Sequence, residues 1–577
     1  MKYLPRDVVS PVDLFDSEMD PRLPAGTRVN SYEAYPEVVK PLQLTAVTVP
    51  NDHGVRRQLR DLGLTEIDPP WLLTSRTHQG RLFVNLSWVL YMADRLPGAD
   101  AGELERQLFG QHIPVAIPRP AVSAGERWLI RLNLPRFIIM LGLSMLTSKR
   151  RMEKHVALRR AMALDELTNL QLDDLIEQYQ YHIMDTGDWN TRGTLAGVIL
   201  ISLLGRLVGP DKARHIIHIL GDVGEVESAA PALRIRETAQ AARRRNPGLA
   251  PLLKTAKDRW ETLAEQDHQA YQALQNVIDR YGYRSVAEFV IDARSWQEDP
   301  TPVMDAFVGL LAGKENDDKK AGANQREARK ALLAEESSWR RWLINRTIDL
   351  AHLGARTRER TKGVLILRVD MMRQLSREIA RRLVAAGRLD KTDDLYYLTI
   401  DEVRPALRGE DNGDLGPIAA VRRQEVERLQ ALPEPSEVIM GREPVSLPRL
   451  AEDGEALVLT GLGVSGTAVE GRARVVKNTD ALDDFEPDEI LIAQYTDAGW
   501  TPYFTMASAV VVETGGLLTH TSTVARELGL PAVVNVRDCT SLIHTGDLLA
   551  VDPLNGEVRI LERAGQDSPG DAVASVQ

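Results

Sequence analysis

The stretch ETGGLLTHTSTVARELGLPAVVNV (513–536) decides the fold of the C-terminal part of this chain. The run AVVV (509–512) precedes it and predicts a buried strand. Gly515 and Gly516 then predict a turn that lets another backbone or a ligand approach closely. Strand, turn and the helix signals that follow indicate an α/β unit in which His520 lies between the turn and the helix.

The predicted helix begins next to this histidine. Thr521 and Ser522 are good N-cap residues, and the helix ends at Gly529, which Pro531 follows. We therefore expect His520 at a helix N-terminus, where backbone N–H groups favour a bound anion and a neutral imidazole. A neutral imidazole there suits attack on phosphorus. The competing interpretation is a histidine that only caps the helix or packs against it.

Composition limits the possible classes of protein. The 577 residues are 43% hydrophobic and 27% charged, as in a globular protein of two to four domains. The net charge of −11 disfavours nucleic acid or an anionic membrane as a partner. The single cysteine, Cys539, excludes an intrachain disulfide, and we expect no metal site. The N-terminus lacks a signal-peptide pattern, and the best apolar run (134–146) is broken and shorter than a membrane span. These features predict a cytoplasmic protein without a membrane partner.

Changes in sequence pattern divide the chain into five segments. Residues 1–118 predict an irregular α+β start, and 119–431 predict long amphipathic helices. Four prolines in 432–450 predict an extended, semi-stiff connector. Short β-branched runs around one helix predict a compact α/β domain at 451–562, and 563–577 are expected to be disordered. The predicted fold is thus multidomain, with a largely α-helical body and a C-terminal α/β domain.

The C-terminal domain resembles a known family. With GVSGTAVEGRARVV (463–476) before it and GDLLAVDPLNGEV (546–558) after it, the segment 495–536 is similar to the swivelling phosphohistidine domain of phosphoenolpyruvate (PEP)-utilising enzymes. That family includes phosphoenolpyruvate synthase, pyruvate phosphate dikinase, rifampicin phosphotransferase and phenylphosphate synthase subunits. The resemblance implies that His520 takes phosphate from an ATP-derived donor and carries it between two sites.

The resemblance also assigns roles to neighbouring residues. It implies that Thr519 orients the histidine and that Gly515 and Gly516 form its turn, with the hydroxyls of the following Thr-Ser step at the helix start. Arg526 aligns with the family's Ala-Arg-Glu; the alternative is that it pairs with a carboxylate at the helix surface.

Two domains of larger family members have no expected counterpart here. The chain ends soon after residue 562, which leaves no room for a (β/α)₈ barrel, and residues 1–118 are too few for an ATP-grasp domain. LLAGKE (310–315) is not a P-loop. We therefore expect no cofactor on this chain. ATP and Mg²⁺ are expected at a separate ATP-grasp subunit.

The rest of the chain resembles the acceptor-binding domain of rifampicin phosphotransferase-like proteins. NSYEAYPEVVKPL (30–42), GRLFVNLS (80–87) and GRLDKTDDLYYLTIDEV (387–403) carry that similarity. RTRERTKGVLILR (356–368) resembles the family's Arg-Glu-x-x-Lys helix.

On that helix Arg358 and Lys362 are four residues apart and share one face, where they are candidates to stabilise phosphoryl oxygens. The alternative is a solvated basic face. His182 and His352 fall in helical segments and are interpreted as structural.

These features predict the phosphohistidine-carrying subunit of an ATP-dependent dikinase-type phosphotransferase. An ATP-grasp partner loads His520, converting ATP to AMP and phosphate. The domain then swings to the helical body, where phosphate passes to a hydroxyl of a small acceptor, expected to be aromatic or phenolic. Two alternatives remain open: a phosphohistidine-bearing regulator or scaffold without a small-molecule acceptor, and a degenerate antibiotic phosphotransferase without activity.

Overall fold

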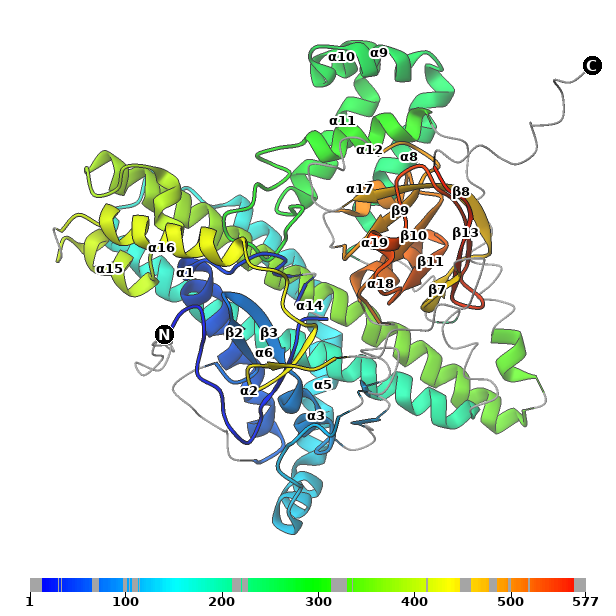
Figure 1. Cartoon of the computed structure of the whole chain (residues 1–577), viewed down its shortest axis with the longest axis horizontal. Helices are drawn as coiled ribbons and strands as arrows, with labels where there is room; N and C mark the ends of the chain where they lie inside the picture. Colours follow the sequence, from blue (N-terminus) through cyan, green and yellow to red (C-terminus); the bar gives the residue numbers. More distant parts are fainter. Residues whose placement is uncertain are drawn as a thin grey trace, which may run out of the picture.

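The protein is multidomain, with a helical body, a small N-terminal sheet and a C-terminal α/β domain (Figure 1). The computed structural model describes residues 13–29, 31–32, 34–64, 72–96, 101–102, 104–105, 113, 115–209, 219, 227–312, 329–334, 336–410, 413–446, 458–476, 485–496, 500–516 and 519–564. The predicted disordered tail lies outside these residues from position 565 onward.

A five-stranded sheet, in the order β2-β3-β1-β4-β5, joins the start of the chain to the end of the body. Its strands are β1 (Ala25–Thr27), β2 (Ser75–His78), β3 (Arg81–Asn85), β4 (Val438–Met440) and β5 (Glu443–Pro444). The helices beside it are α1 (Pro41–Gln43), η1 (Leu44–Thr48), α2 (Val49–Asp61) and α3 (Leu86–Ala93).

The predicted connector at 432–450 is therefore wrong in its middle part. Strand β4 runs antiparallel to β1, with Ala25 opposite Met440, so backbone hydrogen bonds hold this segment to the body. Its apolar residues decide this outcome, since Val438 and Ile439 are both buried. Residues 447–450 lie outside the described part of the chain.

Three long helices form the centre of the body: α5 (Ala124–Arg160), α6 (Asn169–Val208) and α14 (Ser338–Ala385). Capping boxes start the first two, from Ser123 to Glu126 and from Thr168 to Gln171. Helices α6 and α14 pack closely because glycines meet at the crossing: an added Cβ on Gly354 would lie 3.3 Å from the Cα of Gly197.

Shorter helices extend and cover this centre. They are α8 (Ala230–Arg245), α9 (Leu249–Thr255), α10 (Arg259–Gln266), α11 (His268–Tyr281), α12 (Thr301–Ala312), η3 (Thr392–Tyr397), α15 (Ile400–Arg408) and α16 (Gly416–Gln430).

The C-terminal domain is built on an eight-stranded sheet in the order β6-β13-β12-β8-β9-β10-β11-β7. The strands are β6 (Val458–Thr460), β7 (Leu462–Ser465), β8 (Val469–Val476), β9 (Ile490–Ala493), β10 (Ala509–Val512), β11 (Ala532–Val534), β12 (Leu548–Asp552) and β13 (Glu557–Glu562). Strands β8 to β11 are parallel neighbours, and all residues of β10 are buried as its sequence predicts. Helices α17 (Thr501–Phe504), α18 (His520–Leu528) and α19 (Cys539–Leu542) complete the domain.

The C-terminal domain, orange to red in Figure 1, packs against the body between α14 and the pair α8 and α12. Apolar residues of both parts belong to one buried cluster, which includes Phe307 of α12 and Phe504 of α17. The fit is close: a Cβ on Gly309 would lie 2.4 Å from the Cε of Met506. The structure thus shows the C-terminal domain docked on the body.

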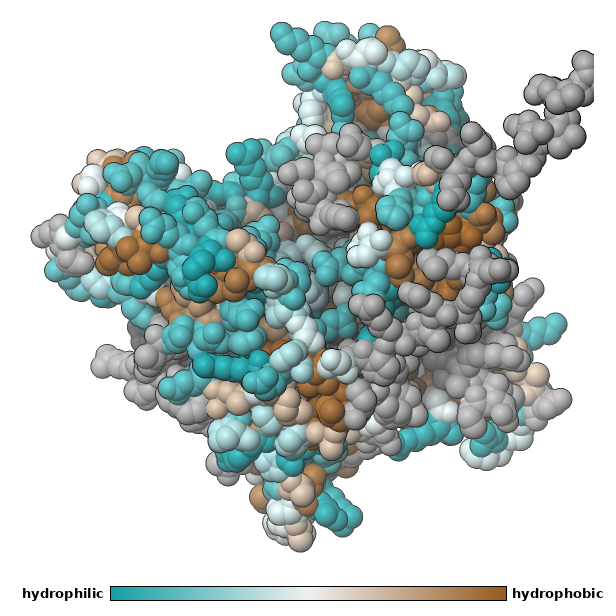
Figure 2. All heavy atoms as spheres, in the orientation of Figure 1, coloured by the Kyte–Doolittle hydropathy of each residue, from teal (hydrophilic) through white to brown (hydrophobic). Residues whose placement is uncertain are grey.

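Two helices, α5 and α6, are long and apolar enough to cross a membrane, and the most apolar 18 residues of each are 22% and 33% buried. This corrects the expectation that no segment approaches a membrane span. The expectation was wrong for α5 because Arg131 and Arg136, in and just before the run 134–146, are too few to make an 18-residue stretch polar. Figure 2 shows apolar residues gathered over the region of the C-terminal domain as well, on an otherwise mainly hydrophilic face.

Candidate active site

His520 is the first residue of α18, directly after the turn at the carboxyl end of β10. Thr519 has extended backbone angles and precedes the helix as its N-cap. The helix ends at Gly529, whose φ of 65° is left-handed, as expected of a C-cap glycine. In open α/β sheets this edge, beyond the carboxyl ends of parallel strands, is where ligands bind.

Thr521 and Ser522 are not the N-cap residues, which corrects that prediction. The helix begins earlier, and both residues lie in its first turn. Ser522 Oγ donates to the carbonyl oxygen of Gly516 at 2.8 Å, and Thr519 Oγ1 donates to the same oxygen at 2.9 Å. Thr521 Oγ1 lies 2.7 Å from Thr496 Oγ1. The carbonyl oxygen of Gly516 lies outside the strands and is free to accept these hydrogen bonds. The hydroxyls of Thr519 and Ser522 therefore hold the turn to the helix.

Gly515 supplies the turn with a conformation that other residues avoid. Its φ is +143°, and an added Cβ would lie 3.2 Å from the Cβ of Val534 and 3.3 Å from Thr519 Oγ1. A residue with a side chain would be unfavourable here for two reasons: its backbone would adopt a strained φ, and its Cβ would crowd these two neighbouring atoms. The turn therefore depends on glycine, and it fixes where His520 begins the helix.

The His520 side chain is buried, with 2% exposure, in the contact between the two parts of the protein. Its Nε2 lies 3.3 Å from Thr501 Oγ1 of α17. Burial first and the charge of Lys362 second hold the pKa of His520 well below its usual value near 6.5, with Glu359 opposing them. The docked imidazole is therefore neutral at pH 7 and able to act as a nucleophile.

Cations from α14 meet the start of α18. Arg358 Nη2 donates to Thr523 Oγ1 at 3.2 Å and to Glu359 Oε1 at 2.8 Å. Burial alone would raise the pKa of Glu359, but Arg358 and Lys362 outweigh it and lower the pKa to about 2. Glu359 is thus ionised; it is ion-paired with Arg358 and lies within electrostatic range of Lys362 and His520. The structure brings these predicted residues together from segments far apart in the sequence.

Arg526 is buried, with 7% exposure, on the side of α18 that faces the body. Burial first and Arg358 second lower the pKa of Arg526 to about 10. It therefore lies inside the contact between domains, away from the solvent-exposed helix surface.

Sequence reasoning missed several polar residues of this site. Arg284 is fully buried and ion-paired with Glu288 at 2.7 Å, and it also disfavours a charged His520. Thr501 and Thr496, which contact His520 and Thr521, were not singled out either. The only available signal was the spacing of four residues between Arg284 and Glu288, and the segment that holds them is not helical.

A cavity of about 550 Å³ opens beside the docked domain. Tyr495 lines it from the C-terminal domain and stacks on Tyr32 of the body, with the two ring centroids 5.9 Å apart. The next residue, Thr496, contacts Thr521 of α18. Apolar and aromatic side chains make up much of the remaining wall: Tyr35, Val38, Val39, Val286, Val290, Trp296 and Pro302. The size and lining are those of a small-molecule site.

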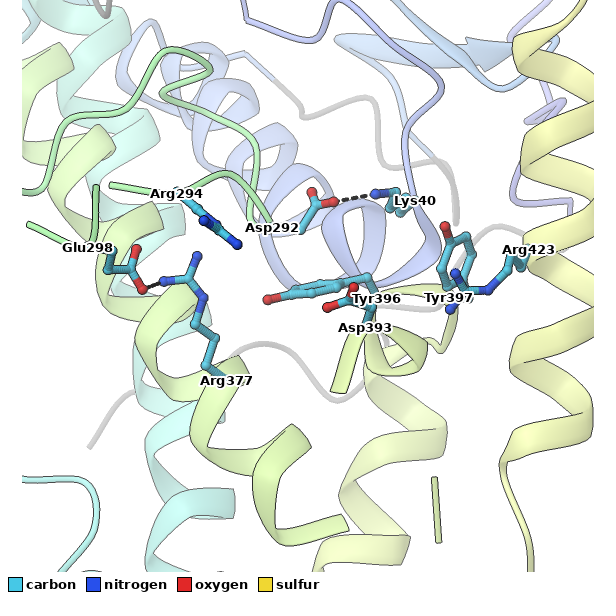
Figure 3. A pocket seen from close by; sticks show the side chains of 9 residues that line it. All are labelled: Lys40, Asp292, Arg294, Glu298, Arg377, Asp393, Tyr396, Tyr397 and Arg423. Carbon is cyan, nitrogen blue, oxygen red and sulfur yellow. Dashed lines mark hydrogen bonds and ion pairs between the residues drawn. The ribbon is translucent and has the colours of Figure 1, made fainter. Parts of the chain in front are cut away.

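A second, polar cavity of about 470 Å³ shares Lys40, Asp292 and Arg294 with the first. Figure 3 shows that Arg377 and Arg294 extend toward one another there, while Lys40 pairs with Asp292. The hydroxyl of Tyr396 points to the same side of the cavity as the two arginines. One connected region thus offers an apolar part and a charged part.

No three His, Cys, Asp or Glu side chains among the described residues lie close enough together to hold a metal ion. The buried Cys539 packs in the core of the C-terminal domain.

Comparison with protein families identifies the two parts of the chain. The family "PEP-utilising enzyme, mobile domain" matches residues 485–556, which include the β10–α18 unit and His520. Residues 485–556 are thus similar to the mobile domain of PEP-utilising enzymes. The family "Rifampicin phosphotransferase fourth domain" matches residues 190–359 of the body. The suspected resemblance to rifampicin phosphotransferase is thereby confirmed.

The chain is also similar to individual proteins. An uncharacterised protein of Mycobacterium tuberculosis is 28% identical over 96% of this chain and 64% of its own length. The prodigiosin synthesizing transferase PigC of Serratia marcescens is 32% identical over 48% of this chain and 32% of its own. Rifampicin phosphotransferase of Bacillus subtilis is 30% identical over 50% of this chain and 34% of its own.

The chain thus spans less than two thirds of the length of these relatives. A solution structure of Enzyme I covers 59% of this chain at 12% identity with a TM-score of 0.14, which is too low to establish a common fold. Together, the mobile domain and the named relatives support a phosphohistidine phosphotransferase.

Proposed function

We propose that His520 carries a phosphoryl group from an ATP-grasp partner to a hydroxyl of a small aromatic acceptor held by the body. One observation carries the proposal: a buried, neutral imidazole at a helix N-terminus lies within electrostatic range of Lys362 and Arg358 of the body, and Arg358 also bonds to Thr523 of the same helix. In this docked state the cations stand where the oxygens of a phosphorylated His520 would need compensation.

The transfer consists of two displacements at phosphorus. In the first, a lone pair of the neutral imidazole forms an N–P bond while the P–O bond to the donor's leaving oxygen breaks. In the second, the acceptor oxygen forms an O–P bond while the N–P bond breaks and returns the electron pair to the imidazole. The acceptor's hydroxyl proton leaves to solvent or to the departing imidazole nitrogen.

Electrostatics favour an acceptor that ionises easily. Glu359 has a pKa of about 2, so it is a weak base, and its ion pair serves chiefly to hold Arg358. Arg358 and Lys362 compensate the developing negative charge, and a phenol, with a pKa near 10, needs less help from a base than an alkyl alcohol does. Among hydroxyl compounds, a phenol therefore suits this site best.

The cavity of about 550 Å³ is the acceptor site in this proposal. Tyr495 belongs to the mobile domain, so docking completes the wall of the cavity. Aromatic walls such as Tyr35 and Trp296 suit an aromatic ring, and closing the domain excludes water from the transfer.

In this proposal ATP and Mg²⁺ bind to a separate ATP-grasp subunit in a heteromeric complex. Phosphorylation at one protein and transfer at another requires His520 to leave the docked position, which a swivelling domain allows.

The experiment combines the purified chain with ATP, Mg²⁺ and an ATP-grasp protein encoded beside its gene, with phenol as the first acceptor. The proposal predicts AMP, an acid-labile phosphate on His520, and its loss to phenyl phosphate when phenol is added. A label that leaves only to another protein would support the regulatory alternative. Phosphorylation of the chain by ATP alone would rule out the need for a partner.

A further inference from the structure

Arg368 of α14 is a buried cation without a carboxylate partner in the described part of the chain. Its side chain is 2% exposed, and its Nε has no hydrogen-bond partner. Its Nη1 contacts only the thioether sulfur of Met371, at 3.3 Å. A thioether is a weak acceptor, so this contact does little to compensate the charge.

Neighbouring arginines show the usual arrangement. Arg159 donates to Asp370 at 2.6 Å, and Arg373 donates to the same carboxylate at 2.8 Å. Both guanidinium groups are also buried, with side-chain exposures of 7% for Arg159 and 0% for Arg373, yet each has an anionic partner. Burying a charge without such a partner is strongly unfavourable, so Arg368 is an exception among these three buried arginines.

Two other polar groups, both on α6, lie within electrostatic range of this guanidinium. The hydroxyl of Tyr179 on α6 makes no hydrogen bond to a described residue, although it lies within electrostatic range of Arg368. His182, one turn further along α6, has a buried Nδ1 that lacks a partner. Burial first and Arg368 next lower the pKa of His182 to about 4, so its ring is neutral and one nitrogen can donate.

The surrounding charges leave the site positive. Asp185 influences Arg368 only at a distance, and the ion pair that Asp185 makes is with Arg57 at 3.7 Å. Arg151 stacks over Trp189 at 3.4 Å and adds a second cation nearby, and Lys154 adds another. Together these groups create a positive potential where α5, α6 and α14 meet.

We propose that Arg368, Tyr179 and His182 form a binding site for an oxyanion, either the carboxylate or the phosphate group of a small ligand. The planar guanidinium offers parallel N–H groups that match two oxygens of such an anion. The hydroxyl and the imidazole supply two more donors from α6. The bound anion provides the charge partner that the protein does not.

This site is distinct from the phosphoryl-transfer site. Arg368 follows Lys362 by six residues, which places it about 9 Å further along the helix and turned by about 120°. The cations beside His520 therefore face the mobile domain, whereas Arg368 faces α5 and α6. Its occupation does not depend on the function proposed for His520.

The test measures the melting temperature of the full-length chain in chloride buffer, with added sodium phosphate or sodium benzoate at matched ionic strength. The wild type is expected to show a saturable rise in Tm with at least one of the two anions, and the responding anion identifies the ligand's charged group. Arg368→Met is expected to lose that response. Without added anion its Tm equals or exceeds that of the wild type, because an unpaired buried charge has been removed.

Two control variants make the result specific. Arg373→Met removes an equally buried but paired arginine of the same helix, so its Tm falls while its anion response remains. His520→Ala keeps the full response, because the mobile domain contributes nothing to the site.

Four outcomes overturn the proposal. They are no anion response in the wild type, an unchanged response in Arg368→Met, a fall in its Tm as large as that of Arg373→Met, or loss of the response in His520→Ala.

Discussion

Replacing Thr523 by valine tests the docked arrangement with the smallest change that the structure offers. Valine has the same shape and the same β-branching, so packing and helix propensity are kept. The substitution removes the acceptor of the 3.2 Å hydrogen bond from Arg358. Thr523 also donates to the carbonyl oxygen of Thr519 within its own helix, but that bond is lost equally in the docked and undocked states and cancels.

The expected effect follows from that single interdomain bond. A hydrogen bond to a charged group contributes about 1.5–3 kcal/mol, and we take the lower limit of about 1.5 because Thr523 is half-buried and Arg358 keeps its bond to Glu359. About 1.4 kcal/mol is tenfold in an equilibrium constant, so the ratio of docked to undocked chains should fall about tenfold.

Single-molecule fluorescence transfer measures that ratio directly. Dyes on cysteines introduced at Trp339 of α14 and Leu554 of the mobile domain report the separation of the two parts, since both positions are well exposed. Cys539 stays unlabelled, because burial raises the pKa of its thiol well above the usual value. A docked-to-undocked ratio within twofold of the wild type would refute the idea that Arg358 and Thr523 hold the domains together.

Three further predictions concern the same site. Lys362→Met should slow transfer from phosphorylated His520 to phenol by about 10²–10³-fold in quench-flow while loading by the partner is unchanged, and equal slowing of both steps would contradict its role on the body. Gly515→Ala should destabilise the mobile domain by about 1–3 kcal/mol in urea unfolding, because its φ is +143°, whereas Gly142→Ala, with nothing within 4 Å, should stabilise α5 slightly. Docking should weaken about tenfold between pH 7.5 and 5.5, because an undocked imidazole binds a proton near pH 6.5 while the pKa of docked His520 lies well below that; a pH-independent dye signal would show that the imidazole is not buried on docking.

The local signals around His520 were readable because they are short-range. A β-branched run, a diglycine and a terminal Gly529 predict strand, turn and helix end without knowledge of the fold. The predicted N-cap position was wrong because Thr519, Thr521 and Ser522 are all good capping residues. The sequence does not show that the hydroxyls of Thr519 and Ser522 instead donate to the carbonyl oxygen of Gly516.

The contacts between distant segments were not predictable in the same way. The burial of Arg284 and Glu288 beside the mobile domain depends on how the helices pack, and a charged pair looks the same in sequence whether it is buried or exposed. The β4–β5 hairpin was not predicted because its proline-rich flanks are typical of linkers. Its pairing partner β1 is more than 400 residues away in the sequence, so no local pattern indicates the pairing.

The central claim is that one buried imidazole carries the phosphoryl group. The most direct measurement locates the phosphate by mass spectrometry, under alkaline conditions, after the chain has been incubated with the loading partner and ATP or with phosphoramidate as a chemical donor. The account predicts one phosphoryl group, on the peptide that contains His520, and none on the His520→Ala variant. A phosphate on another residue, or on that variant in equal amount, would contradict it.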